Sequence, residues 1–228
     1  MEISRRNLMT AAAAAGLLMV PGVAAYGKTA SASTGYEPRP LPFRPGSLRG
    51  ISERLIVSHH ARNYAGAVRR LNSILDSLSS LPADAKPYQV AGLKREELVA
   101  RNSMILHEYY FDNLGGDGKP ADEISKQLKG SFGSVDDWQH DFELTGQSLS
   151  GGSGWVILAY SPRDRKLHNV WCADHTVGLA DSTPLLVMDM YEHSYQMDYG
   201  ADAKAYIDAF FENINWERVD ERLRRCAV

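Results

Sequence analysis

The feature that most constrains the fold is the stretch from Pro184 to His193, where an apolar run is followed at once by a carboxylate and an imidazole. The run 184–188 has the length and composition of a buried strand. Asp189 and His193 stand four residues apart, a spacing that places both side chains on one face of a helix. On stiff backbone such a pair forms half of a metal site. The same spacing is also typical of an ordinary hydrogen-bonded pair, and spacing alone does not decide between the two.

Two further histidines lie upstream on segments with a strongly helical pattern. His59 falls in the run 58–60 and His107 in the run 106–111. Together with Asp189 and His193 they would supply three imidazoles and one carboxylate. Such a donor set leaves one coordination position open, which is typical of a catalytic metal rather than a structural one.

The length and charge of the chain exclude several classes of protein. Its 228 residues, 44% of them hydrophobic, allow one large domain or two small ones around a real core. The 25 Lys and Arg against 28 Asp and Glu leave a formal charge of −3, so no nucleic-acid partner or anionic membrane surface is indicated. Cys172 and Cys226 are too few for a disulfide framework or a thiolate metal cage. Whether they pair with each other is left open.

Residues 1–25 have the pattern of an export signal. Arg5 and Arg6 lie in a basic start, the run 11–20 is apolar, and the run 23–25 ends in small residues that suit a cleavage site. Paired arginines are typical of the twin-arginine route, so a periplasmic or secreted bacterial protein is expected. The apolar run is shorter than the roughly 20 residues that span a bilayer, and no membrane anchor is expected.

The next segments are expected to form an arm and a first long helix. Residues 26–50 carry prolines and glycines without periodicity, which predicts an extended arm. From Glu53 to about Ser79 the apolar residues recur at helical spacing. Ser52 is a suitable N-cap for this helix, and Glu53 is favourable in its first turn.

A second long helix is expected over residues 96–114, ended by the glycine-rich run 115–118. Residues 81–93 contain two prolines and a glycine, and a loop is expected there. The two helices would form an antiparallel hairpin, the N-terminal domain of residues 51–118. A histidine on the buried face of each helix could then reach one point.

Short strand-like runs follow at 155–160, 167–172 and 184–188, and the last stretch, 203–225, has a helical pattern. The resulting expectation is an α+β fold. In it the long helical hairpin precedes a C-terminal α/β domain, residues 119–228, with a three-stranded antiparallel sheet.

Several motifs resemble those of the iron/manganese superoxide dismutases. The run 183–195 is similar to the C-terminal signature of that family, D-x-W-E-H-A-Y, with Tyr191 in the place of the Trp. The runs 131–138, 152–155 and 213–219 resemble the family motifs S-F-G-S, G-S-G-W and N-x-x-N-W-x-x-V. Together the matches extend from about Leu41 to Val219.

The resemblance implies one iron or manganese ion per subunit, held by His59, His107, Asp189 and His193. It implies that the protein converts superoxide to dioxygen and hydrogen peroxide while the metal alternates between trivalent and divalent states. His175 falls where many members place a group that hydrogen-bonds to the metal-bound solvent. The other residues implied around the ligands are Trp155, Tyr191, Phe111 and Glu192. Iron and manganese accept the same ligands, and the choice between them stays open.

The sequence departs from the family pattern around the substrate channel. Ala67 stands where most members have a gateway tyrosine, and Tyr64, one helical turn earlier, is the candidate to supply the missing hydroxyl. The resemblance also implies a homodimer, in which Glu192 bonds the ligand histidine of the partner. Asn63 and Gln196 replace the His and Tyr that meet at the family interface, and they could pair as amides.

Arg62 and Lys204 are the candidate side chains for steering the superoxide anion to the site. Two other functions use the same ligand set. A metal-binding relative with weak or no dismutase activity is favoured by the substitutions at Ala67, Asn63 and Tyr191. A hydrolytic zinc enzyme would need a general base near the open position, and Glu108 is expected to point away from it.

Overall fold

The computed structural model describes residues 35–226, and residues 1–34 and 227–228 are not described. The predicted export signal and the first part of the predicted arm lie outside the described residues. The elements, in chain order, are η1 (Pro45–Ser47), α1 (Glu53–Ser58), the π-helical η2 (His59–Tyr64), α2 (Ala65–Ser79), α3 (Pro87–Asp112), α4 (Asp122–Phe132), α5 (Val135–Gln147), β1 (Trp155–Ser161), β2 (Lys166–Cys172), β3 (Thr183–Asp189), η3 (Glu192–Ser194), α6 (Gln196–Tyr199), α7 (Ala203–Glu212) and α8 (Trp216–Cys226).

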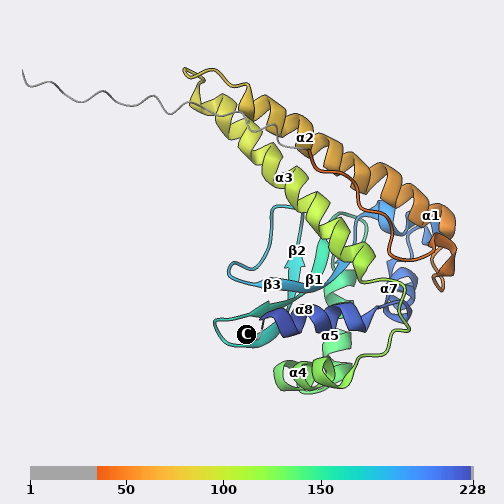
Figure 1. Cartoon of the computed structure of the whole chain (residues 1–228). Coiled ribbons are helices and arrows are strands. Elements are labelled where there is room, and N and C mark those ends of the chain that lie inside the picture. Colours follow the sequence, from red (N-terminus) through yellow and green to blue (C-terminus); the bar gives the residue numbers. More distant parts are fainter. Residues whose placement is uncertain (1–34, 227–228) are drawn as a thin grey trace, which may run out of the picture. The chain divides into compact units, whose positions relative to one another are not determined.

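The predicted α+β fold is confirmed. A helical hairpin, formed by α1, η2 and α2 against α3, precedes a three-stranded antiparallel sheet with further helices around it (Figure 1). Residues from Gly35 onward pack as one unit. The predicted domain boundary at 118 and 119 falls in the connection between α3 and α4 and stays a prediction.

The start of the second hairpin helix corrects a sequence prediction. The loop predicted over 81–93 ends early, because α3 begins at Pro87, nine residues before the predicted start. Proline is well suited to the first position of a helix, where its missing N–H would have no partner in any case. The Gln89 side chain also accepts a hydrogen bond of 2.9 Å from the backbone N–H of Lys86. Pro87 therefore starts the helix and does not interrupt it.

The sheet has the strand order β2-β1-β3, with both pairings antiparallel. The register places Trp155 opposite Cys172 on one side and opposite Asp189 on the other. A shift of register between Leu158 and Ala159 accompanies Pro184, which lies on the edge strand β3 where a missing backbone donor is tolerated. Helices α3 and α8 pack on β3, while α4 and α5 pack on β2.

The hairpin and the sheet are joined by hydrogen bonds near the end of α3. The side chain of the buried Asn113 donates to the backbone carbonyl of Val187 in β3 over 2.9 Å. Leu114 forms an isolated bridge with Ile214, just before α8. These contacts hold the C-terminal half of α3, which carries His107, against the strand that ends at Asp189.

The described part of the arm, residues 35–50, contains no helix or strand apart from the short 3-10 turn η1. Tyr36 and Asn72 exchange two hydrogen bonds, 2.9 Å and 2.8 Å, which attach the arm to α2. Cys172 is buried and Cys226 is half-buried, and both thiols are free. Among residues 35–226 no helix is both long enough and apolar enough to cross a membrane.

Candidate metal centre

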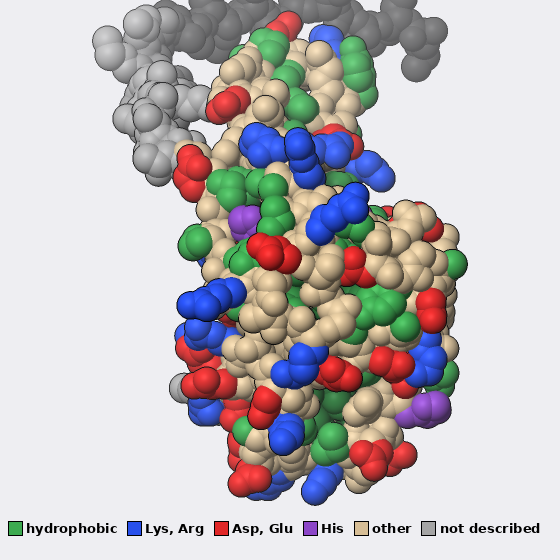
Figure 2. Space-filling view, turned by 90° about the vertical axis from the view of Figure 1, so that its right-hand side faces the viewer, with side chains coloured by type: hydrophobic (Ala, Val, Ile, Leu, Met, Phe, Trp, Pro, Cys, Tyr) green, Lys and Arg blue, Asp and Glu red, His purple; other side chains and the backbone are tan. Residues whose placement is uncertain are grey.

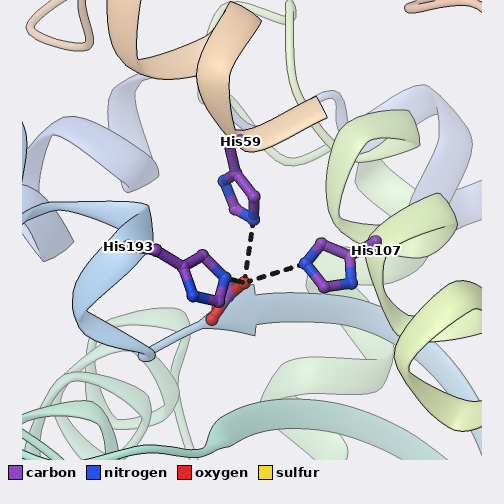
Figure 3. A group of neighbouring side chains, drawn as sticks. His59, His107 and His193 are labelled. Atoms are coloured by element: carbon purple, nitrogen blue, oxygen red, sulfur yellow. Dashed lines mark hydrogen bonds and ion pairs between the residues drawn. The ribbon is translucent and has the colours of Figure 1, made fainter. Parts of the chain in front are cut away.

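Four side chains from separate elements meet at one buried point. His59 opens η2, His107 lies on α3, Asp189 ends β3 and His193 lies in η3. Figure 3 shows the three imidazoles pointing toward one carboxylate. The Nε2 atoms lie 3.0 Å (His59), 3.6 Å (His107) and 3.2 Å (His193) from Oδ2 of Asp189. The candidate ligand atoms all lie within 4.8 Å of one another.

The local backbone differs from the expected strand-to-helix step. The chain leaves β3 at Asp189 and forms a single 3-10 turn, η3, that carries His193. The Ser194 hydroxyl donates to the backbone carbonyls of Asp189 and Tyr191, over 2.8 Å and 2.7 Å. The hydroxyl therefore holds this turn against the end of the strand, and the carboxylate and imidazole converge without a long helix.

The nitrogens of His59 and His107 that face this point lack hydrogen-bond partners, whereas Nε2 of His193 bonds to Oδ2 of Asp189. His59 and His107 are each 1% exposed. Among the described residues, both ring nitrogens of His59 and Nε2 of His107 are buried without a hydrogen bond, since Asp189 Oδ2 approaches His59 without hydrogen-bond geometry. Buried polar atoms left unpaired are costly and rare. A cation bound at about 2.1 Å from each donor would pair Nε2 of His59 and Nε2 of His107, because its ligands stand roughly 3 to 4 Å apart.

Hydrogen bonds on the outer side of the ligands fix which atoms face inward. His107 donates from Nδ1 to the backbone carbonyl of Ser103 over 2.6 Å, which leaves a lone pair on Nε2. Asp189 accepts at Oδ1 from the backbone N–H of Tyr191 over 2.8 Å, so Oδ2 faces the imidazoles. A metal-binding histidine commonly donates its second nitrogen in this way. The residues present therefore fit a bound metal ion.

Burial sets the charge state of the cluster. It lowers the pKa of His59, and it lowers the pKa of His107 to about 3. Burial alone would raise the pKa of Asp189, but the charge and hydrogen bond of His193 hold that pKa well below its usual range. The expected state is a carboxylate facing the neutral imidazoles of His59 and His107, the protonation state in which these side chains bind metals.

Three aromatic side chains form a wall beside the cluster. The indole Nε1–H of Trp155 donates to Nδ1 of His175 over 3.0 Å. The His175 and Tyr191 rings stack at 4.8 Å with an interplanar angle of 12°, and Tyr191 in turn stacks on His193 at 5.4 Å. Burial, and then the charge of Asp189, raise the pKa of Tyr191 to about 12. Three of the residues expected near the metal are thus brought together on one side.

A second group of aromatics packs against His59 and His107. Phe111 lies 5.1 Å from His59 and 6.4 Å from His107, measured between ring centroids. Tyr110 lies 5.0 Å from His59, and its hydroxyl is 3.4 Å from the hydroxyl of Tyr206. Tyr206 donates to the backbone carbonyl of Asp189 over 2.8 Å.

Sequence analysis missed Tyr110 and Tyr206. Both are fully buried. The only local signal was helical periodicity, which is also typical of ordinary core residues. Their contacts with the cluster depend on helices far apart in the sequence.

The structure does not bring the Tyr64 hydroxyl to the cluster. The Tyr64 ring is buried, 6.3 Å from the ring of His107, but its hydroxyl donates to Glu108 over 3.0 Å and accepts from the backbone N–H of Arg39 over 2.8 Å. Glu108 also pairs with the Arg39 guanidinium at 3.0 Å. Both side chains therefore face the arm, and Glu108 points away from the ligands as expected.

The candidate steering residues differ in their surroundings. Lys204 lies on α7 and pairs with both Asp208 and Glu143, so nearby carboxylates offset its charge. Arg62 is exposed on η2. Arg70 on α2, which sequence analysis did not consider, pairs with Glu96, so its charge is offset in the same way as that of Lys204. On the face in Figure 2, Lys and Arg side chains gather in a band near the hairpin, while both signs are interleaved below it.

Comparisons with known proteins agree with this geometry. The family model described as "Iron/manganese superoxide dismutases, C-terminal domain" matches residues 120–222. A superoxide dismutase [Fe] of Cupriavidus metallidurans is 54% identical, over 82% of this chain and 95% of its own length. A superoxide dismutase [Mn] 1 of Halobacterium salinarum is 32% identical over 84% of this chain and 96% of its own length, and a superoxide dismutase [Fe] of Aquifex pyrophilus is 32% identical over 81% and 89%. The expectation from the sequence motifs is confirmed: the chain belongs to the iron/manganese superoxide dismutase family.

Proposed function

We propose that this protein dismutates superoxide at one iron or manganese ion held by His59, His107, Asp189 and His193. The observation that carries the proposal is the convergence of unpaired buried histidine nitrogens on one ionised carboxylate. When bound, the ion supplies the change between trivalent and divalent states by which one superoxide is oxidised to dioxygen and a second is reduced to peroxide. Two protons are consumed for each hydrogen peroxide released.

The residues around the ligands position the site and supply a proton donor. The Trp155 indole occupies Nδ1 of His175, which places the histidine proton on Nε2. Tyr191 packs flat on His175 and limits its rotation. Asn102 donates to the backbone carbonyl of His175 over 2.6 Å and so attaches this loop to α3. His175 is therefore the best oriented group in this wall for donating a hydrogen bond or proton toward a small anion at the site.

A second candidate function is metal binding with weak dismutation. Two observations favour it. Ala67 is buried on α2 at the position where a gateway tyrosine would supply a hydroxyl. The Tyr64 hydroxyl, which could replace it, bonds to Glu108 and not to a group at the cluster. Loss of one proton-relay group commonly lowers a rate by about 100- to 10,000-fold without ending the chemistry. The dismutase function stays first, because His175 keeps its orienting contacts.

Reconstitution with each metal separates the two functions. The unfolded protein is refolded with iron or with manganese, and metal content and dismutase rate are measured for each form. Iron is tested first because the relative with 54% identity carries [Fe] in its name. We expect one ion per chain and activity that is lost in His107→Ala. One bound ion with no activity in either form would replace the dismutase proposal by the metal-binding function.

We also propose that the protein is a homodimer. Glu192 is exposed on η3, beside the candidate ligand His193. Val57 on α1 and Met197 on α6 are large apolar side chains with 47% and 45% exposure. Light scattering after size exclusion should give about twice the chain mass, and Met197→Lys should shift it toward the monomer. Leu144→Lys, at an exposed position on α5, is the matched control, and a monomeric wild-type protein would contradict the proposal.

Export by the twin-arginine route is proposed from residues 1–25. Replacing Arg5 and Arg6 together with Lys should leave the unprocessed protein in the cytoplasm when it is expressed in a bacterium with that pathway. Fractionation with a cytoplasmic and a periplasmic marker measures the outcome. Equal export of the wild-type and double-Lys proteins would contradict the proposed route.

A further inference from the structure

We propose that Asp198 is a positioning residue for the metal centre, because it fastens the start of the helix leading to His59 to the segment that follows His193. The inference rests on the proposed function in that both require the four-residue metal site. Asp198 itself lies on the surface in α6, five residues beyond His193, and it belongs to neither the ligands nor the aromatic walls.

Asp198 holds Ser52 through two contacts. One carboxylate oxygen accepts from the Ser52 backbone N–H over 2.7 Å, and the other accepts from the Ser52 hydroxyl over 2.7 Å. The Ser52 hydroxyl oxygen in turn accepts from the Leu55 backbone N–H over 3.1 Å, as the N-cap of α1. A carboxylate beside a helix N-terminus is also favoured by the helix dipole.

Short stretches of hydrogen-bonded backbone connect Ser52 to the candidate ligand His59, and Asp198 to the candidate ligand His193. From Ser52 the helical chain reaches His59 in seven residues, about two turns. On the other side, Tyr199 N–H bonds to Tyr195 carbonyl over 2.9 Å, and the Ser194 hydroxyl holds η3 to the carbonyl of Asp189 over 2.8 Å. A displacement of Ser52 should therefore also displace His59, because the backbone between them is short and hydrogen-bonded.

The two segments meet again at the metal site, where His59 Nε2 lies 3.0 Å from Asp189 Oδ2. Ser52, α1, His59, Asp189, η3 and Asp198 form a closed loop of contacts. Without Asp198, the first turn of α1, which begins the continuous helical segment through η2 and α2, would lose the partner that orders its cap, and helix N-termini fray when their N–H groups lack partners. His59 would then sample positions outside the coordination geometry.

Neighbouring contacts hold a different part of the chain. The Tyr199 hydroxyl donates to the carbonyl of Gly50, and Asn213 exchanges hydrogen bonds with the backbone of Arg49. These contacts anchor the residues before the helix. Among the contacts of Asp198, Tyr199 and Asn213, only that of Asp198 is made to the N-cap residue Ser52. Removing the Asp198 side chain should therefore leave Arg49 and Gly50, which precede the helix, in place.

The test uses the full-length protein loaded with iron and compares three variants. Asp198→Ala removes the contact. Asp198→Asn can keep both bonds, because its amide oxygen can accept from the Ser52 N–H and its NH2 group can donate to the Ser52 hydroxyl. Asp202→Ala is the matched control: Asp202 is also an exposed aspartate, and it caps α7 by accepting from the backbone N–H of Ala205 over 3.1 Å.

Two readouts that need no turnover are measured: iron release to excess EDTA, and the rhombicity of the high-spin ferric EPR signal. Urea unfolding of the metal-free proteins reports stability separately. In Asp198→Ala we expect release to be about fivefold faster, the scale set by loss of one helix cap, together with an altered rhombicity. In Asp198→Asn and Asp202→Ala we expect release within twofold of wild type, although Asp202→Ala should lose similar stability.

Each other outcome overturns the inference. Wild-type release in Asp198→Ala, or equal acceleration in both Ala variants, would show that Asp198 contributes no more than any helix cap. Either result would leave the proposed function intact if the wild-type protein binds iron and is active. A wild-type protein that retains no metal would overturn the proposed function and this inference together.

Discussion

The Trp155 indole donates a hydrogen bond of 3.0 Å to Nδ1 of His175, and this single contact assigns the protons of the histidine. The His175 ring therefore carries its N–H donor at Nε2. The Tyr191 ring stacks on one face of it, with 4.8 Å between the ring centroids. Strand β1 therefore orients a group on the loop that follows β2, and the orientation arises from the pairing of Trp155 with Cys172 across the sheet.

Replacing Trp155 with Phe should lower kcat/KM by about five- to tenfold, because a buried hydrogen bond is lost and His175 becomes free to adopt the other tautomer. Metal content should not change. Trp138→Phe is the matched control, since the Trp138 indole also donates over 3.0 Å, to Asn169 on β2 beneath α4 and α5. Equal losses in both variants would show a general packing effect.

Metal binding should stabilise the fold, because it pairs Nε2 of His59 and Nε2 of His107, which are otherwise buried without a hydrogen bond. At metal concentrations about 100 times Kd the gain is about 2.7 kcal/mol, which corresponds to a rise in Tm of roughly 5 to 10 °C for a chain of this size. Differential scanning calorimetry with and without chelator measures it. His107→Ala should show almost no response to the metal, and an equal response in that variant would count against the site.

Tyr64→Phe should reduce stability more than activity. The hydroxyl that it removes links Glu108 to the backbone of Arg39, so we expect a loss of about 1 to 2 kcal/mol in the free energy of unfolding. The change in kcat should stay below about threefold, far less than the loss of a proton relay. Urea titration and stopped-flow kinetics separate the two effects. A hundredfold fall in kcat would restore Tyr64 as a catalytic group.

Two glycines should respond to alanine in opposite directions. Gly50 has φ of +72°, and an added Cβ would lie 2.9 Å from both the Ala209 Cβ and the Tyr199 hydroxyl, so Gly50→Ala should cost about 1 to 3 kcal/mol of stability. Gly92 lies in α3 with open space around it. There alanine should stabilise by up to about 1 kcal/mol, because it favours the helix. Chemical denaturation of both variants measures the difference, and two equal changes would contradict the strain at Gly50.

The two thiols should react at different rates with iodoacetamide. Burial raises the pKa of Cys172 to about 11, so at pH 8 only about one molecule in a thousand carries the reactive thiolate. Cys226 is half-buried and should be labelled first. Peptide mass spectrometry of the native protein identifies the site. The Cys226→Ser variant should remain unlabelled until guanidinium unfolds it, and rapid labelling of native Cys172 would contradict its burial.

Local patterns identified most of the elements, because helix and strand periodicities are properties of short segments. The strands β1 to β3 agree with their predicted ranges to within one residue at each end. The start of α3 was predicted wrongly, since Pro87 was interpreted as a helix breaker although it stands at a first helical position. A proline either starts a helix, at its first position, or interrupts one, in its interior. The sequence pattern alone did not distinguish these two positions for Pro87.

The sequence by itself determined the family, the helical hairpin followed by the sheet, and the four side chains able to bind a metal, because motif spacing and periodicity are local. The tertiary structure alone decided that the Tyr64 hydroxyl faces the arm, that carboxylates surround Lys204, and that Tyr206 supports the carbonyl of Asp189. It also brought Asp198 to Ser52 across 146 residues. The physical reason is that the direction of a side chain depends on partners brought close by folding, and no spacing along the chain encodes those distances.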